Sequence, residues 1–156
     1  MAARRGGFSS LLIGVDGSRH AKRAVSFVAS LVPPSGGRVT VLRVVEPVRV
    51  PSVALFPRSV RSKLEGQASD LRAARVRAAR RDVEQAVAQL KGSGWRAGGE
   101  VRLGVPQREL LSAVGPSHAD LLVVGARGSG AVERFFLGSV AETVTKRAPI
   151  SVLIVK

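Results

Sequence analysis

The sequence contains no cysteine and no tyrosine, and aromatic residues make up only 4% of its 156 positions. Without cysteine there can be no disulfide and no thiolate metal site. With so few aromatic rings, the chain has little on which the bases of a single strand could stack. No apolar run approaches the roughly 20 residues of a membrane-spanning helix, and the N-terminal residues lack the apolar stretch of a secretory signal. We therefore expect a cytoplasmic protein without a membrane partner.

Acidic residues are also scarce: 11 acidic side chains stand against 25 basic ones, for a formal net charge of +14. Such an excess of basic residues is typical of proteins that bind nucleic acid, but the sequence contains no nucleic-acid-binding motif. An arginine-rich proteome or a solvated basic face explains the charge as well. A basic nucleic-acid-associated protein is therefore the least favoured of the functions considered below.

What the chain does contain is enough apolar sequence, 45% of its residues, to build a real core. The length is that of one domain, and we expect a single domain over residues 1–156. Residues 1–8 are expected to form a flexible tail. Residues 46–62 are long and punctuated by proline, and we expect a mobile loop there.

Apolar runs and helical patterns alternate along the chain, which predicts an α/β fold with parallel strands joined by right-handed crossovers. The first, fourth and fifth runs are continuously apolar, as in strands buried on both faces. Strands are predicted at 10–15, 38–45, 96–103, 120–125 and 150–155, and helices after Ser18, over 60–90, from Pro106 and from Ser139.

A glycine-rich segment lies between the fourth predicted strand and the last helix. Gly125 and Gly128 would let the backbone approach a ligand closely, because glycine has no Cβ. Gly138 and Ser139 stand at a helix start, where free N–H groups and the helix dipole favour negative charge. A polyphosphate suits such a site. A structural interpretation also exists: Gly125 simply ends a strand, and Ser139 and Glu142 form a capping box.

Two other phosphate-binding motifs are excluded. A Walker A loop ends in Gly-Lys-Ser/Thr, and the chain contains no Gly-Lys pair. The dinucleotide fingerprint needs three glycines after the first strand, whereas "GSGAVE" lacks the third and follows the fourth strand.

The complete spacing, Gly125-x2-Gly128-x9-Gly138-Ser139, resembles the ATP-binding signature of the universal stress protein family. "GVDGS", residues 14–18, is similar to the opening of that family, and residues 119–156 resemble its C-terminal third almost throughout. Residues 48–98 are the poorly matched part. The resemblance implies a doubly wound five-stranded parallel sheet of order 3-2-1-4-5 with helices on both faces.

In that order the strand sequence reverses between strands one and four, and ligands bind at the carboxyl ends of the strands beside such a reversal. Asp16 and the glycine segment would then line one crevice. The resemblance implies that Gly14 and Asp16 contact the nucleoside and that the backbone of Val44 reads the adenine edge. An Asx turn at Asp16 and a buried strand valine at Val44 remain open as structural alternatives.

The phosphates would meet the N–H group of Val140 beside Ser139, and the side chains of Arg127 and Arg134 could neutralise them. Both arginines could equally be solvated. ATP would carry Mg²⁺, but Glu133 is the only acid in the segment, so no dedicated metal site is predicted.

The expected function is that of an ATP-binding universal stress protein, a nucleotide-dependent stress-response or signalling module with an unidentified protein partner. The resemblance also implies a homodimer through the C-terminal edge strand. An alternative keeps the fold without the nucleotide, as a dimeric stress-related interaction protein. His20 and His118 are expected to be surface residues, and no catalytic constellation is visible, so we expect at most slow ATP hydrolysis. The arginines at 72–81 are expected to form a solvated helix face.

Overall fold

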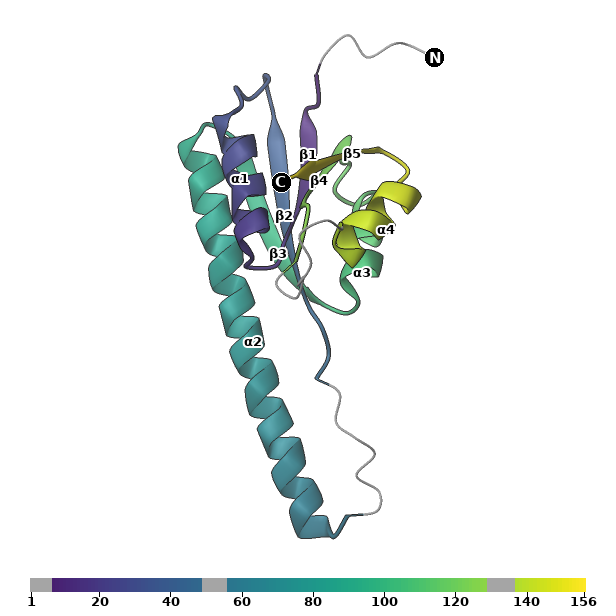
Figure 1. Cartoon of the computed structure of the whole chain (residues 1–156). Coiled ribbons are helices and arrows are strands. Elements are labelled where there is room, and N and C mark those ends of the chain that lie inside the picture. Colours follow the sequence, from purple (N-terminus) through teal and green to yellow (C-terminus); the bar gives the residue numbers. More distant parts are fainter. Residues whose placement is uncertain (1–6, 49–55, 129–136) are drawn as a thin grey trace.

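The computed structural model describes residues 7–48, 56–128 and 137–156. In these residues five parallel strands form one sheet in the order β3-β2-β1-β4-β5, which confirms the predicted topology (Figure 1). The elements in chain order are β1 Ser10–Val15, α1 Arg19–Ser30, β2 Arg38–Val45, α2 Arg58–Gly92, β3 Arg96–Leu103, α3 Pro106–Ala113, β4 Leu121–Gly125, α4 Ser139–Arg147 and β5 Ser151–Val155.

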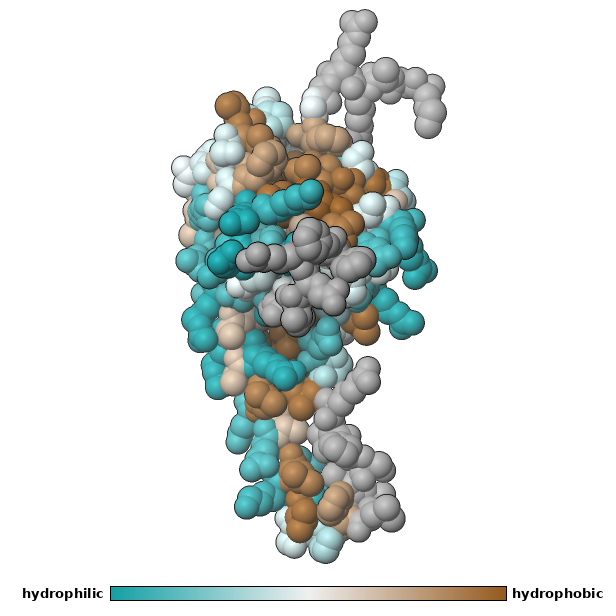
Figure 2. Space-filling view, viewed as in Figure 1, coloured by the Kyte–Doolittle hydropathy of each residue, from teal (hydrophilic) through white to brown (hydrophobic). Residues whose placement is uncertain are grey.

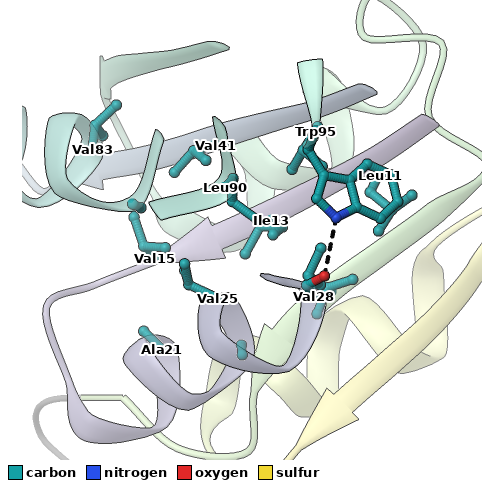
Figure 3. Close-up of a cluster of buried hydrophobic side chains, with 14 of the residues drawn as sticks. Leu11, Ile13, Val15, Ala21, Val25, Val28, Val41, Val83, Leu90 and Trp95 are labelled. Atoms are coloured by element: carbon teal, nitrogen blue, oxygen red, sulfur yellow. Dashed lines mark hydrogen bonds between the residues drawn. The ribbon is translucent and has the colours of Figure 1, made fainter. Parts of the chain in front are cut away.

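Helices cover both faces of the sheet, as predicted. α1 and α2 pack on one face, around Ile13 and Trp95, and α3 and α4 pack on the other, around Leu12 and Leu122. Successive residues of β1 serve opposite faces, since strand side chains alternate. Both faces are apolar, and this explains why β1 reads as an uninterrupted apolar run. Figure 3 shows the first cluster, in which the Trp95 indole N–H donates to the Val28 carbonyl at 3.1 Å.

The register brings the ends of three strands to one level. Gly14 in β1 pairs with Leu42 in β2 on one side and with Val124 in β4 on the other. The segments that follow β1, β2 and β4 therefore leave the sheet side by side at its carboxyl edge. The strand order reverses beside β1 at this point.

The fifth strand differs from its prediction. Its continuous apolar run suggested burial on both faces, but β5 lies at the edge, and Val152 to Val155 are only half-buried. β4 is the only neighbour of β5 among the described residues, so the outer edge of β5 has no strand beside it.

The long helix α2 begins at Arg58, inside the segment 46–62 that was predicted to be a loop. Pro57 stands immediately before it. Proline has no backbone N–H, so it is tolerated at the start of a helix, where that group would have no partner, but not in the interior. Residues 49–55 of the predicted loop and residues 1–6 of the predicted tail lie outside the described residues.

Candidate functional site

A cavity of about 830 Å³ opens at the carboxyl edge of the sheet. Its walls come from the ends of β1, β2 and β4 and from parts of α2, α3 and α4. Nine of the residues that the sequence analysis assigned to the site line this one cavity: Gly14, Asp16, Val44, Gly125, Arg127, Gly128, Gly138, Ser139 and Val140. The structure thus brings the segment after β1 and the glycine-rich segment together.

The turn between β1 and α1 is built around Asp16. Its Oδ1 atom accepts a hydrogen bond from the Ser18 N–H at 2.9 Å, which is the Asx turn considered above. Gly17 has a φ of 79°, a conformation that favours glycine. Ser18 then caps α1, since its hydroxyl accepts from the Ala21 N–H at 3.1 Å. The turn therefore fixes the Asp16 carboxylate at the cavity wall.

Hydrogen bonds tie this turn to the segment after β4. The Ser18 hydroxyl donates to the Arg127 carbonyl at 3.3 Å. On the other side, the Gly138 N–H donates to the Ala126 carbonyl at 2.8 Å. The start of α1, the end of β4 and the start of α4 thus form one connected floor.

The glycines of this floor have packing reasons that the sequence analysis missed. A Cβ on Gly125 would lie 2.7 Å from the backbone carbonyl carbon of His20, so glycine lets β4 pack directly against α1. A Cβ on Gly138 would lie 3.2 Å from the Cα of Arg127. Gly128 is different, because its Cβ would meet only a side-chain atom, the Oδ2 of Asp16, at 2.8 Å.

The start of α4 rules out the capping-box interpretation. The N-cap residue is Gly138, so Ser139 is already the first helical residue, one position too late to cap the helix. Glu142 instead pairs with Lys146 at 2.6 Å. The hydrogen bond and the positive charge of Lys146 lower the pKa of the Glu142 carboxyl.

The first N–H groups of α4 have no carbonyl one turn back within the helix. These N–H groups belong to Ser139, Val140 and Ala141, and all three residues line the cavity. No side chain in the described segments 7–48, 56–128 and 137–156 caps this end. The cavity therefore meets the positive end of a helix dipole.

An apolar part of the cavity wall comes from β2 and α3. Val44 is half-buried and packs with a cluster that includes Leu42 and Leu110. The Val44 side chain therefore has a packing role, but it is only partly buried and not the buried strand valine of the structural alternative. Leu110 also explains Gly14, because a Cβ there would lie 2.9 Å from Leu110 Cδ2.

Sequence reasoning missed two basic residues of the wall, Arg43 on β2 and Arg75 on α2. Arg43 sits within an apolar strand, and its sequence neighbours give no sign that its side chain meets a cavity. Arg75 was seen only as one of several helix arginines, because sequence periodicity does not tell which part of a 35-residue helix lies over the site. Glu133 and Arg134 lie outside the described residues.

The described residues contain no group of three or more His, Cys, Asp or Glu side chains that could hold a metal ion. Within the same residues, none of the helices has the length and apolar character needed to cross a bilayer.

The sequence profile of the universal stress protein family matches residues 7–156. A universal stress protein of Thermus aquaticus, named for the QAH/OAS sulfhydrylase 3' region, is 35% identical over 150 residues, covering 96% of this chain and 99% of that protein. The universal stress protein UspA from Lactobacillus plantarum has a TM-score of 0.75 at 22% identity, covering 97% of this chain and 100% of that one.

Two further structural neighbours hold nucleotides. A universal stress protein in complex with cAMP has a TM-score of 0.64 at 24% identity and covers 96% of this chain and 98% of its own. The protein from Archaeoglobus fulgidus in complex with dAMP has a TM-score of 0.64 at 19% identity and covers 94% and 97%. With the profile match over nearly the whole length, these findings show that the chain belongs to the universal stress protein family.

Proposed function

We propose that the cavity binds ATP and that the protein acts as a nucleotide-dependent stress-response or signalling module. The observation that carries the proposal is the convergence of the two predicted segments on one cavity. Its volume of about 830 Å³ lies within the range of ~300–1,000 Å³ that small-molecule pockets occupy. The complexes of two neighbours with cAMP and dAMP support an adenine nucleotide.

The triphosphate would lie along the floor, against Gly128 and the start of α4. The N–H groups of Ser139 and Val140 can donate to phosphate oxygens, and the helix dipole adds a favourable field there. Arg127 lines the same side and can contribute its positive charge. Mg²⁺ would be held chiefly by the phosphates and water, as is usual for this ion.

The nucleoside would occupy the other side of the cavity. Asp16 lines the cavity next to Gly128, where the nucleoside would meet the phosphates, and its carboxylate suits a donor such as a ribose hydroxyl or the adenine amine. Gly14 has no side chain to project into the cavity, and the backbone of Val44 can form hydrogen bonds with the edge of the base. The apolar side chains of Leu42 and Leu110 supply a surface on which a base can be buried.

We also propose a homodimer joined through β5. This strand is at the sheet edge, and its apolar residues are only half-buried. An unpaired edge of this kind is normally covered, and antiparallel pairing with a second copy would cover it. Bound ATP would then change a surface of the dimer that a protein partner recognises. This interaction would take place in the cytoplasm.

Calorimetric titration of ATP, adenosine and tripolyphosphate tests the site directly. The wild-type protein should bind ATP at one site per chain and more tightly than either part alone. Gly128→Ala should weaken ATP binding by about tenfold or more, because the new Cβ would push the Asp16 carboxylate aside. Melting curves of both proteins serve as the folding control. Equal ATP affinity in the two proteins would refute the site.

A further inference from the structure

We propose that Ser18 is a positioning residue of the nucleotide site, because its hydroxyl group fixes the orientation of the peptide bond between Arg127 and Gly128. In this orientation the Gly128 N–H can donate to the phosphates. The inference rests on the proposed function and deepens it, since it names a residue outside the glycine-rich segment on which phosphate binding depends.

The Ser18 hydroxyl makes two hydrogen bonds, one within α1 and one across the fold. Its oxygen accepts from the Ala21 N–H at 3.1 Å, and its single hydrogen is donated to the Arg127 carbonyl at 3.3 Å. The first bond caps α1. The second joins residues that are 109 positions apart and is not needed for capping, so it has another role.

That second bond sets the direction of the next N–H group. The described residues contain no cis peptide bond, and in a trans peptide the C=O and N–H groups point in opposite directions. The Arg127 carbonyl points toward Ser18 at the start of α1, so the Gly128 N–H points away from α1.

The start of α4 lies on the side to which the Gly128 N–H points. A Cβ on Gly138, the N-cap residue of α4, would be only 3.3 Å from the Gly128 nitrogen. α4 packs on the face of the sheet opposite to α1. The Gly128 N–H therefore stands beside the N–H groups of Ser139 and Val140, to which the phosphates are assigned above.

The preceding residue is held from the other two sides of the segment. The Ala126 N–H donates to the Val155 carbonyl of β5 at 2.7 Å, and the Ala126 carbonyl accepts from the Gly138 N–H at 2.8 Å. The hydroxyl of Ser18 then holds the carbonyl of Arg127. Each of these two successive carbonyls is thus anchored by a different helix start.

The peptide bond before Gly128 benefits from such an anchor. A peptide bond next to glycine rotates with little steric resistance, because glycine has no Cβ. If this one turned over, the Arg127 carbonyl would replace the Gly128 N–H at the cavity. Asp16 already places a carboxylate there, since a Cβ on Gly128 would lie 2.8 Å from its Oδ2 atom. A carbonyl oxygen beside this carboxylate would repel a phosphate, whereas an N–H attracts it.

Three substitutions separate the donor from the helix cap. Ser18→Gly removes the hydroxyl at little cost to α1, because glycine serves almost as well at an N-cap. Ser18→Ala removes the hydroxyl and also caps poorly, whereas Ser18→Thr keeps both functions. The Ser18 N–H that holds Asp16 is a backbone group and is present in all three.

Calorimetric titration of these variants with ATP, tripolyphosphate and adenosine tests the role. Ser18→Gly and Ser18→Ala should both lose about tenfold in affinity for ATP and for tripolyphosphate, the effect of one lost hydrogen bond. Their affinity for adenosine should stay at the wild-type value, and Ser18→Thr should bind all three ligands as the wild type does. The melting temperature should fall more for Ser18→Ala than for Ser18→Gly.

Ala29→Gly is the matched control, because it weakens α1 at a position that does not line the cavity. It should lower the melting temperature and keep the affinity for ATP. Wild-type ATP affinity in Ser18→Gly would overturn the positioning role and leave the proposed function standing. A loss in Ala29→Gly equal to that in Ser18→Gly, or an equal loss for adenosine, would also overturn it. Failure of the wild-type protein to bind ATP would instead count against the proposed function itself.

Discussion

At the scale of single residues, the glycines of the signature are not equivalent. Gly125 faces the backbone of α1, whereas Gly128 faces one side-chain oxygen of Asp16. The sequence motif predicted which glycines line the site, and for Gly125 it left two explanations open, the close approach of a ligand or the end of a strand. It could not show the packing role of Gly125, because that role depends on how closely α1 crosses β4.

Gly125→Ala should therefore destabilise the fold whether or not nucleotide is present. The added methyl group would lie 2.7 Å from a backbone atom of His20, and overpacking of this kind costs about 1–3 kcal/mol. Urea denaturation of the ligand-free protein measures the change. The matched control is Gly98→Ala in β3, where a Cβ would meet nothing within 4 Å. Similar denaturation midpoints for the two variants would contradict the packing role.

Asp16 has two roles, the hydrogen bond that holds the turn and the proposed contact with the nucleoside, and two substitutions can separate them. Asp16→Asn keeps the side-chain oxygen that accepts from Ser18 but removes the negative charge, whereas Asp16→Ala removes both. We expect both variants to lose affinity for ATP by about tenfold while tripolyphosphate binding is kept, and only Asp16→Ala to lower the melting temperature. An equal loss of affinity for both ligands would argue against nucleoside contact.

At the scale of elements, the sequence predicted each strand and helix found in the described residues, and most of them carry a clear apolar pattern. The run at 96–103 has the weakest pattern, because it contains few apolar residues. The helix predicted over 60–90 is α2, which runs from Arg58 to Gly92. The buried residues of this helix, Ala79, Val83, Ala86 and Leu90, all lie in its C-terminal half. The N-terminal half extends past the sheet (Figure 1) and exposes apolar side chains such as Val60 and Leu71. Figure 2 shows brown, apolar patches on this end of the molecule.

The two halves of α2 should accordingly differ in local stability. Helical segments without tertiary packing are marginal in water, so the amides of residues 58–71 should exchange with solvent at least a hundred times faster than those of residues 79–90. Hydrogen exchange followed by mass spectrometry of peptides measures both rates in one sample. Uniform protection along α2 would show instead that something covers the N-terminal half.

At the scale of the whole molecule, the parallel topology explains how distant segments come to share one site. The order β3-β2-β1-β4-β5 puts β1 between β2 and β4, so the ends of these three strands meet at one edge. The alternation of elements predicted the parallel sheet, but the strand order came from the family resemblance. The place of Arg75 in the cavity wall could not be foreseen, because it depends on the path of α2 across that edge.

The proposed dimer leads to a prediction about the backbone of β5. The Val155 carbonyl accepts from the Ala126 N–H, so the backbone groups of Ile154, one residue earlier, face the open edge. Ile154→Pro should remove an outward donor and leave a folded monomer, since proline is tolerated at a free edge. Sedimentation velocity of this variant and of Ile154→Val, which keeps the donor, measures the outcome. A wild-type protein that is monomeric at all concentrations would contradict the dimer.

The central claim is that a nucleoside triphosphate occupies the cavity at the carboxyl edge of the sheet. The most direct measurement is a crystal structure of the protein grown with ATP and Mg²⁺. We predict phosphate density within hydrogen-bond distance of the backbone N–H groups of Gly128, Ser139 and Val140, with the base against Val44. ATP bound elsewhere, or an empty cavity at saturating ATP, would contradict the account.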